Sequence, residues 1–153
     1  LARELYIYVG FITGNLEREK KLLNYKLSTQ TKNPNGLLQA LGLLNIYQQN
    51  FEESYAIYDR LINGLKEDDS YTRYLGAVAA IGAGHKNAAS LLLQLSKMDS
   101  SVNYESRYAL GVLYQEAENY NAAAQHYNSI ANHGFKSEFI DFTIDDSKVN
   151  TPK

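Results

Sequence analysis

Apolar side chains recur every three or four residues along most of this chain, which is the spacing of an amphipathic α-helix. Short polar or glycine-containing segments such as Gly14-Asn15, Asn33-Pro34 and Asp68-Asp69 separate the runs and are typical of helix ends, caps and loops. The pattern therefore predicts an all-α fold. Its expected helices cover residues 1–14, 16–28, 37–49, 51–63, 71–83 and 85–98, with one more pair within 107–127.

The segment from Arg107 to Tyr127 has the most informative pattern, because small and large residues alternate in it at fixed places. Gly111 and Ala123 are small, which would let two helices approach closely. Leu110, Tyr114 and Tyr127 are large and would fill the space around that approach. We therefore expect this segment to form two packed antiparallel helices.

The same pattern repeats along the chain at intervals of 34 and 35 residues. Gly111 is preceded by Gly76 and Gly42, and each of these glycines follows a leucine. In the second helices, Ala123 has small counterparts and Tyr127 has large ones. These counterparts are Ala88 and Ser54 for Ala123, Leu92 and Tyr58 for Tyr127, and His85, Phe51 and Leu16 for Tyr120, which opens the helix. A fixed period of this length indicates a repeat protein.

The spacing of Leu110-Gly111, Tyr114, Ala123 and Tyr127 resembles the tetratricopeptide repeat (TPR) family. The resemblance covers residues 1–134 and implies a right-handed superhelical solenoid of antiparallel helix pairs, with about four repeats. The expected repeats are 35–66, 69–99 and 104–134, and 1–32 forms a degenerate or capping repeat, because Glu19 stands where a small residue is expected. Residues 135–153 form a C-terminal tail.

The resemblance implies a protein-binding function, because in this family the first helices line a concave groove that holds a partner segment. The groove-facing positions are mostly apolar or aromatic here, and Arg73 is their only cation. This favours an apolar helix or extended segment over a C-terminal carboxylate, which needs several cationic donors. The expected partner-binding residues are Tyr8, Phe11, Leu43, Ile46, Tyr47, Arg73, Ile81, Tyr108, Val112 and Gln115.

Each apolar member of this set has a second interpretation, since an inward-facing residue of a first helix can simply pack against the next repeat. Tyr47 and Tyr108 are the two that we expect to be exposed. A different function is also open, in which the repeat ends or the cluster Phe139, Ile140 and Phe142 mediate a homo-oligomer.

Composition and charge limit the possible partners and compartments. The net charge of -2 gives no electrostatic reason to expect nucleic acid or an anionic membrane. There is no cysteine, which removes thiol chemistry but is compatible with both the cytoplasm and the periplasm or cell envelope. The chain starts at Leu1 rather than methionine, so we expect a piece of a longer bacterial protein in which a signal peptide or membrane anchor could precede it.

No catalytic or metal-binding motif emerges from the sequence, so we expect neither an enzyme nor a cofactor. His126 and His133 are seven residues apart but have no third ligand at close spacing, and His85 has the place of a packing aromatic residue. The carboxylates around Glu52 and Glu67 have the positions of helix-start and loop charges. The segment GAVAAIGAG lacks the lysine and hydroxyl residue of a phosphate loop.

Overall fold

The computed structural model describes residues 14–29, 32–99 and 101–131, and within these ranges all regular structure is helical. This confirms the all-α prediction. The expected helix over residues 1–14 and the C-terminal tail lie outside the described residues. The helices are α2 (Leu16–Thr29), α3 (Asn35–Tyr47), α4 (Phe51–Asp59) with a π-helical turn η1 (Arg60–Gly64), α5 (Ser70–Ala83), α6 (Lys86–Ser96), α7 (Asn103–Glu116) and α8 (Tyr120–Asn128).

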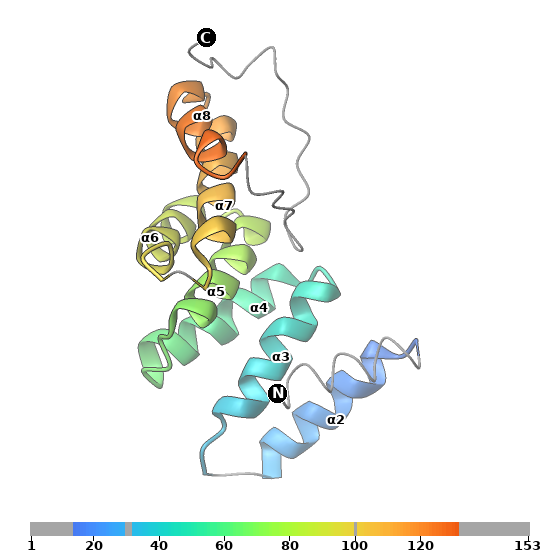
Figure 1. Cartoon of the computed structure of the whole chain (residues 1–153). Coiled ribbons are helices and arrows are strands. Elements are labelled where there is room, and N and C mark those ends of the chain that lie inside the picture. The colour runs from blue at the N-terminus through green and yellow to red at the C-terminus, as the bar shows by residue number, and fades with distance from the viewer. Residues whose placement is uncertain (1–13, 30–31, 100, 132–153) are drawn as a thin grey trace.

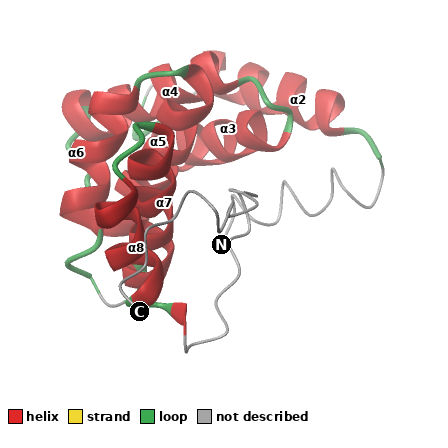
Figure 2. Ribbon diagram, turned by 90° about the horizontal axis from the view of Figure 1, so that it is seen from above, coloured by secondary structure: helices red, strands yellow, loops and turns green. Residues whose placement is uncertain are grey.

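Each helix packs against the next one in the chain, from α2 to α8. In addition, α5 contacts both α3 and α7, which lie two helices away from it along the chain. Figure 1 shows the resulting stack, and Figure 2, seen from above, shows that the helices follow an arc from α2 to α8. Neighbours in sequence are therefore neighbours in space, and no helix needs a long connection.

The core runs through the middle of this stack and is built mainly by α3 and α5. Residues 38–46 of α3 and 74–80 of α5 are buried without interruption, so these two helices are covered on all sides. Leucine, alanine and tyrosine side chains fill the core, including Leu44, Leu75 and Tyr58.

The turns that join α3 to α4, α5 to α6 and α7 to α8 share one backbone geometry. Each contains one residue in the left-handed region, with φ of 62° at Gln49, 84° at Gly84 and 60° at Glu118. Gly14, just before α2, has φ of 65°. These positions are 35, 35 and 34 residues apart, so the sequence period is also a period of backbone conformation.

The residue after each left-handed position is equally regular. It has φ/ψ of -87°/66° at Asn50, -86°/67° at His85 and -90°/73° at Asn119. Its N–H donates a hydrogen bond of 2.8 Å to a carbonyl five residues earlier in all three turns. The accepting carbonyls belong to Asn45, Ala80 and Tyr114.

This geometry corrects the register that the sequence predicted for the middle helix pair. Because the turns are 35 and then 34 residues apart, Ala77 rather than Gly76 is equivalent to Gly42 and Gly111. His85 stands at the N-cap of α6, so it does not open that helix. The counterparts shift by one residue in the same way, to Lys86 for the opening residue, Ala89 for the small one and Leu93 for the large one.

The contacts at Gly42 and Gly111 agree with the close helix approach expected there. A Cβ atom at Gly42 would lie 2.8 Å from Cζ of Tyr58, and one at Gly111 would lie 2.7 Å from Cε1 of Tyr127. Both tyrosines come from the following helix, 16 residues later. At Gly76 the nearest atoms are at 3.3 Å and include Cβ of Tyr58, so this glycine faces the preceding helix instead.

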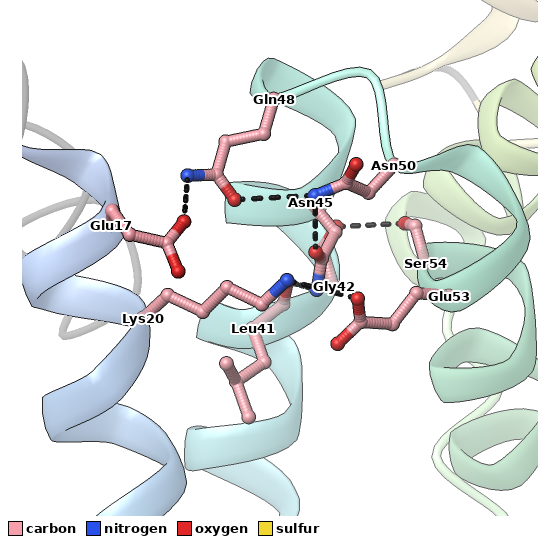
Figure 3. A network of polar contacts seen from close by, with 9 residues as sticks. All are labelled: Glu17, Lys20, Leu41, Gly42, Asn45, Gln48, Asn50, Glu53 and Ser54. Atoms are coloured by element: carbon pink, nitrogen blue, oxygen red, sulfur yellow. Dashed lines mark hydrogen bonds and ion pairs between the residues drawn. The ribbon is translucent and has the colours of Figure 1, made fainter.

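A network of polar contacts ties α2, α3 and α4 together (Figure 3). The Lys20 ammonium lies 2.9 Å from the Glu53 carboxylate, which joins α2 to α4. The buried Ser54 hydroxyl donates a hydrogen bond of 2.7 Å to the carbonyl oxygen of Gly42. Exposed ion pairs contribute about 0–1 kcal/mol, so the buried serine bond is the more important of these contacts for positioning α4 on α3.

Candidate partner-binding surface

Three of the residues expected to line a partner groove are core residues of the chain itself. Leu43 and Ile46 are 3% and 5% exposed, and Val112 is 0% exposed. They therefore offer no surface to a partner, and the prediction is corrected for these three. The reason is that α3 and α7 are covered by neighbouring helices on the side that the family comparison assigned to the groove. Tyr8 and Phe11 lie outside the described residues.

The other aromatic and aliphatic members of the expected groove are only half-buried. Tyr47, Ile81 and Tyr108 pack against the core and keep part of their surface accessible. The Tyr108 ring lies 5.8 Å from the ring of Tyr127, so one face of it is taken by α8. Tyr47 and Tyr108, which we expected to be exposed, are thus shared between core and surface.

The two polar members of the expected groove already have partners within the chain. The Tyr127 hydroxyl donates a hydrogen bond of 2.9 Å to Oε1 of Gln115, and burial raises the pKa of Tyr127, which keeps it a donor. Arg73 forms an ion pair of 3.0 Å with Asp68. Arg73 lines a cleft that contains none of the other expected residues, so the structure does not bring the set together on one surface.

That cleft has a volume of about 300 Å³ and lies between α4 and α6, with α5 contributing Arg73 and Gly76. Apolar and aromatic side chains from both helices line it, and charged side chains stand among them. The lining residues are Tyr55, Tyr58, Asp59, Ile62, Asn63, Lys66, Asp68, Arg73, Gly76, Ala88, Leu91, Leu92 and Leu95. A mixed lining of this kind is usual for small binding clefts.

The wall of the cleft on the α4 side includes the π-helical turn from Arg60 to Gly64. The N–H of Leu65 donates to the carbonyl of Arg60 at 2.9 Å, five residues back. This wider turn bears Ile62 and Asn63, which both line the cleft. The other second helices, α2, α6 and α8, contain no such turn. Single π-turns within α-helices are frequent at functional sites.

The opposite wall continues into a row of exposed apolar side chains on α6 and the residues that follow it. Leu91 is 65% exposed, Leu95 46% and Met98 81%. They follow one another at intervals of four and three residues and so share one helix face. We call Leu91, Leu95 and Met98 the α6 row. The sequence analysis missed this row, although the spacing in HKNAASLLLQLSKM contained the signal.

The histidines and carboxylates that could have suggested catalysis have structural contacts instead. Nε2 of His85 lies 2.8 Å from the Glu52 carboxylate, and the ring stacks on Tyr55 with centroids 4.6 Å apart. His126 stacks on Tyr114 with centroids 5.4 Å apart. Burial, followed by the charges of Lys97 and Arg107, lowers the pKa of His126.

The acidic segment before α5 serves as a helix cap and as one half of an ion pair. The Asp69 carboxylate accepts a hydrogen bond of 3.1 Å from the N–H of Thr72, which confirms its predicted role as an N-cap. Asp68 binds Arg73. In the part of the chain that the structure describes, no three or more His, Asp or Glu residues are placed to hold a metal ion. His133 lies outside those residues.

A scan against models of known protein families and a search of curated proteins both found no match. The relation to TPR proteins therefore depends on the internal repeat of this chain. None of the helices within residues 14–29, 32–99 and 101–131 combines the length and apolar character needed to cross a bilayer.

Proposed function

We propose that this chain is a TPR-like right-handed superhelical solenoid of about four antiparallel helix pairs. The four left-handed turn residues at intervals of 35, 35 and 34 support this proposal, because equal turns at equal spacing place successive helix pairs in equal orientations. The tight contacts of Gly42 with Tyr58 and of Gly111 with Tyr127 support it as well, since they repeat the same close approach in two pairs.

We further propose that the chain is a non-enzymatic module that binds another protein. One observation carries this proposal: the exposed α6 row lies directly beside the cleft between α4 and α6, so that Leu91 and Leu95 belong to both. A contiguous exposed apolar surface beside a cleft is typical of a protein-binding site. Tyr55 and Ile62 offer additional apolar area inside the cleft.

The second-helix surface is favoured over the first-helix groove for a physical reason. Burial of Leu43, Ile46 and Val112 within the monomer already uses the apolar side chains that a groove would have needed. The large apolar side chains that are most exposed among the described residues belong to α6 and α2 instead. A partner gains more free energy by covering exposed apolar surface than by contacting side chains that are already buried.

The test is affinity capture from the source cells with wild type and three double variants. We expect Leu91→Asp/Leu95→Asp to lose a partner that wild type retains, because a buried carboxylate without a partner opposes binding. Leu22→Asp/Tyr25→Asp is the matched control, since both side chains are exposed on α2, away from the cleft. Tyr47→Ala/Tyr108→Ala tests the first-helix groove.

Circular dichroism must first show that all variants are equally helical. A partner lost only with Tyr47→Ala/Tyr108→Ala would return the binding site to the first helices. A partner retained by every variant would contradict binding through either surface. Light scattering on the same samples detects the alternative function, because a dimer that dissociates in one variant would indicate self-association.

A further inference from the structure

The α6 row has the spacing of a helix-docking seam. Ala88, which lines the cleft, precedes it, so the positions Ala88, Leu91, Leu95 and Met98 follow intervals of three, four and three residues. This is the spacing of the a and d positions that pack against a second helix in a coiled coil. Within the chain, α6 packs on α5 and α7 and leaves this seam uncovered. An extended segment would have no reason to match this period.

The charges on α6 indicate the kind of helix that fits. Between His85 and Met98 the only charged residues are Lys86, in the first turn of α6, and Lys97, directly after its last turn. The segment contains no aspartate or glutamate. Carboxylates that lie near its C-terminal end already have partners, since Asp99 accepts hydrogen bonds from Ser101 and Asp68 pairs with Arg73.

A second copy of the chain would fit this seam poorly. In an antiparallel pairing of two α6 helices, Lys86 of each copy would face Lys97 of the other, and in a parallel pairing each lysine would face its own equivalent. Both arrangements place like charges together at both ends of an apolar contact. A helix with carboxylates at its flanks would instead pair with both lysines.

Given that the chain binds proteins as proposed above, we infer that the α6 row and the cleft bind an amphipathic helix of a different protein. This helix has apolar residues at intervals of three and four, and acidic residues at both flanks. Its apolar side chains cover Leu91, Leu95 and Met98, and one of them enters the cleft beside Tyr55 and Ile62. Its carboxylates lie near Lys86 and Lys97.

The experiment measures fluorescence anisotropy with two labelled synthetic peptides. Both contain four leucines at intervals of three, four and three residues on an alanine and glutamine background, and they differ only in having glutamate or lysine at the flanks. We expect the glutamate peptide to bind about tenfold more tightly at low salt, because only its charges complement the lysines. A peptide of the same composition with the leucines dispersed is the control for non-specific binding.

Protein variants locate the site. Leu91→Asp should weaken binding of the glutamate peptide by about tenfold or more, and Tyr25→Asp on α2 should leave it unchanged. Lys97→Glu should reduce or invert the preference for the glutamate peptide without abolishing binding. Equal binding of the two peptides, or binding that Leu91→Asp does not alter, would overturn the inference.

Two further results separate this inference from the proposed function. A cellular partner that depends on Leu91 and Leu95, combined with peptides that do not bind, would leave the protein-binding function intact and refute the acidic helix. A wild-type dimer that Leu91→Asp converts to a monomer would identify a second copy as the occupant and would also refute it.

Discussion

At the scale of single residues, the packing of this chain depends on small side chains at a few positions. The fully buried Tyr58 ring lies so close to Gly42 that an added Cβ atom would be only 2.8 Å from Cζ. Gly36 is in the same helix, but nothing lies within 4 Å of the place its Cβ would take. The two glycines thus have opposite environments within one helix.

Alanine substitutions at these positions should have opposite signs. Gly36→Ala should raise the free energy of unfolding by about 0.5–1 kcal/mol, because alanine loses less conformational entropy in a helix than glycine does. Gly42→Ala has the same gain but adds overpacking that costs about 1–3 kcal/mol, so we expect a net loss. Urea unfolding followed by circular dichroism measures both. Stabilisation by Gly42→Ala would show that Tyr58 can move away.

His126 should make the stability depend on pH. Burial against Tyr114 and the nearby cations Lys97 and Arg107 hold its pKa below the ordinary value of 6.5. The unfolded state then binds a proton at a higher pH than the folded state does, so stability is full above about pH 6.5 and falls as the pH decreases toward the folded pKa. Urea unfolding between pH 8 and pH 5 should show this decline, and His126→Gln should reduce it. An unchanged profile in that variant would contradict the assignment.

At the scale of the structural element, the repeated turn is the unit of this fold. Gly84 is the only glycine in the three turns between helices of a pair, since Gln49 and Glu118 take the same left-handed conformation with a side chain. A Cβ atom in this conformation costs about 1–2 kcal/mol. The chain therefore carries backbone strain in two of its three equivalent turns.

Exchanging these residues should change stability in a predictable direction. Glu118→Gly should raise the free energy of unfolding by about 0.5 kcal/mol, the relief of strain less the entropy that glycine adds to the unfolded chain. Gly84→Ala should lower it by about 1 kcal/mol from strain alone, because nothing lies within 4 Å of the new Cβ atom. Thermal unfolding compares the two variants with wild type. Changes of the same sign would indicate that the turns are not equivalent.

At the scale of the whole molecule, each helix is stabilised mainly by its neighbours in sequence. α5 contacts α3, α4, α6 and α7, whereas α2 packs on α3, and α8 packs on α7. Chains of this kind open from their ends, because an end helix has fewer interfaces to lose.

Amide hydrogen exchange should therefore be slowest in α5 and α3 and fastest in α2 and α8. Leu75→Ala, at a fully buried position of α5, should destabilise by about 2–5 kcal/mol and accelerate exchange throughout the described helices. Leu23→Ala, at a fully buried position of α2, should accelerate exchange mainly in α2 and its neighbour α3. Equal acceleration everywhere by both variants would indicate a single cooperative unit instead.

The sequence by itself determined the helices and their period, because both depend on local properties. Apolar residues at helical intervals identified α2 to α8, and the left-handed conformation at Gly14 and Gly84 was expected of glycines that end a helix. The one-residue error at Gly76 arose since the period alternates between 34 and 35, and a glycine beside the true position Ala77 looked equally suitable. Only the turn geometry distinguishes them.

The tertiary structure alone decided which apolar side chains are available to a partner. Leu43 and Val112 are buried while Leu91 and Met98 are exposed, although all four are apolar residues spaced for a helix face. What separates them is whether a neighbouring helix covers that face, and this is a contact between distant parts of the chain that no local pattern records. The π-helical turn beside the cleft is likewise absent from the sequence pattern, because packing of α4 against α5 and α6, rather than residue type, places it there.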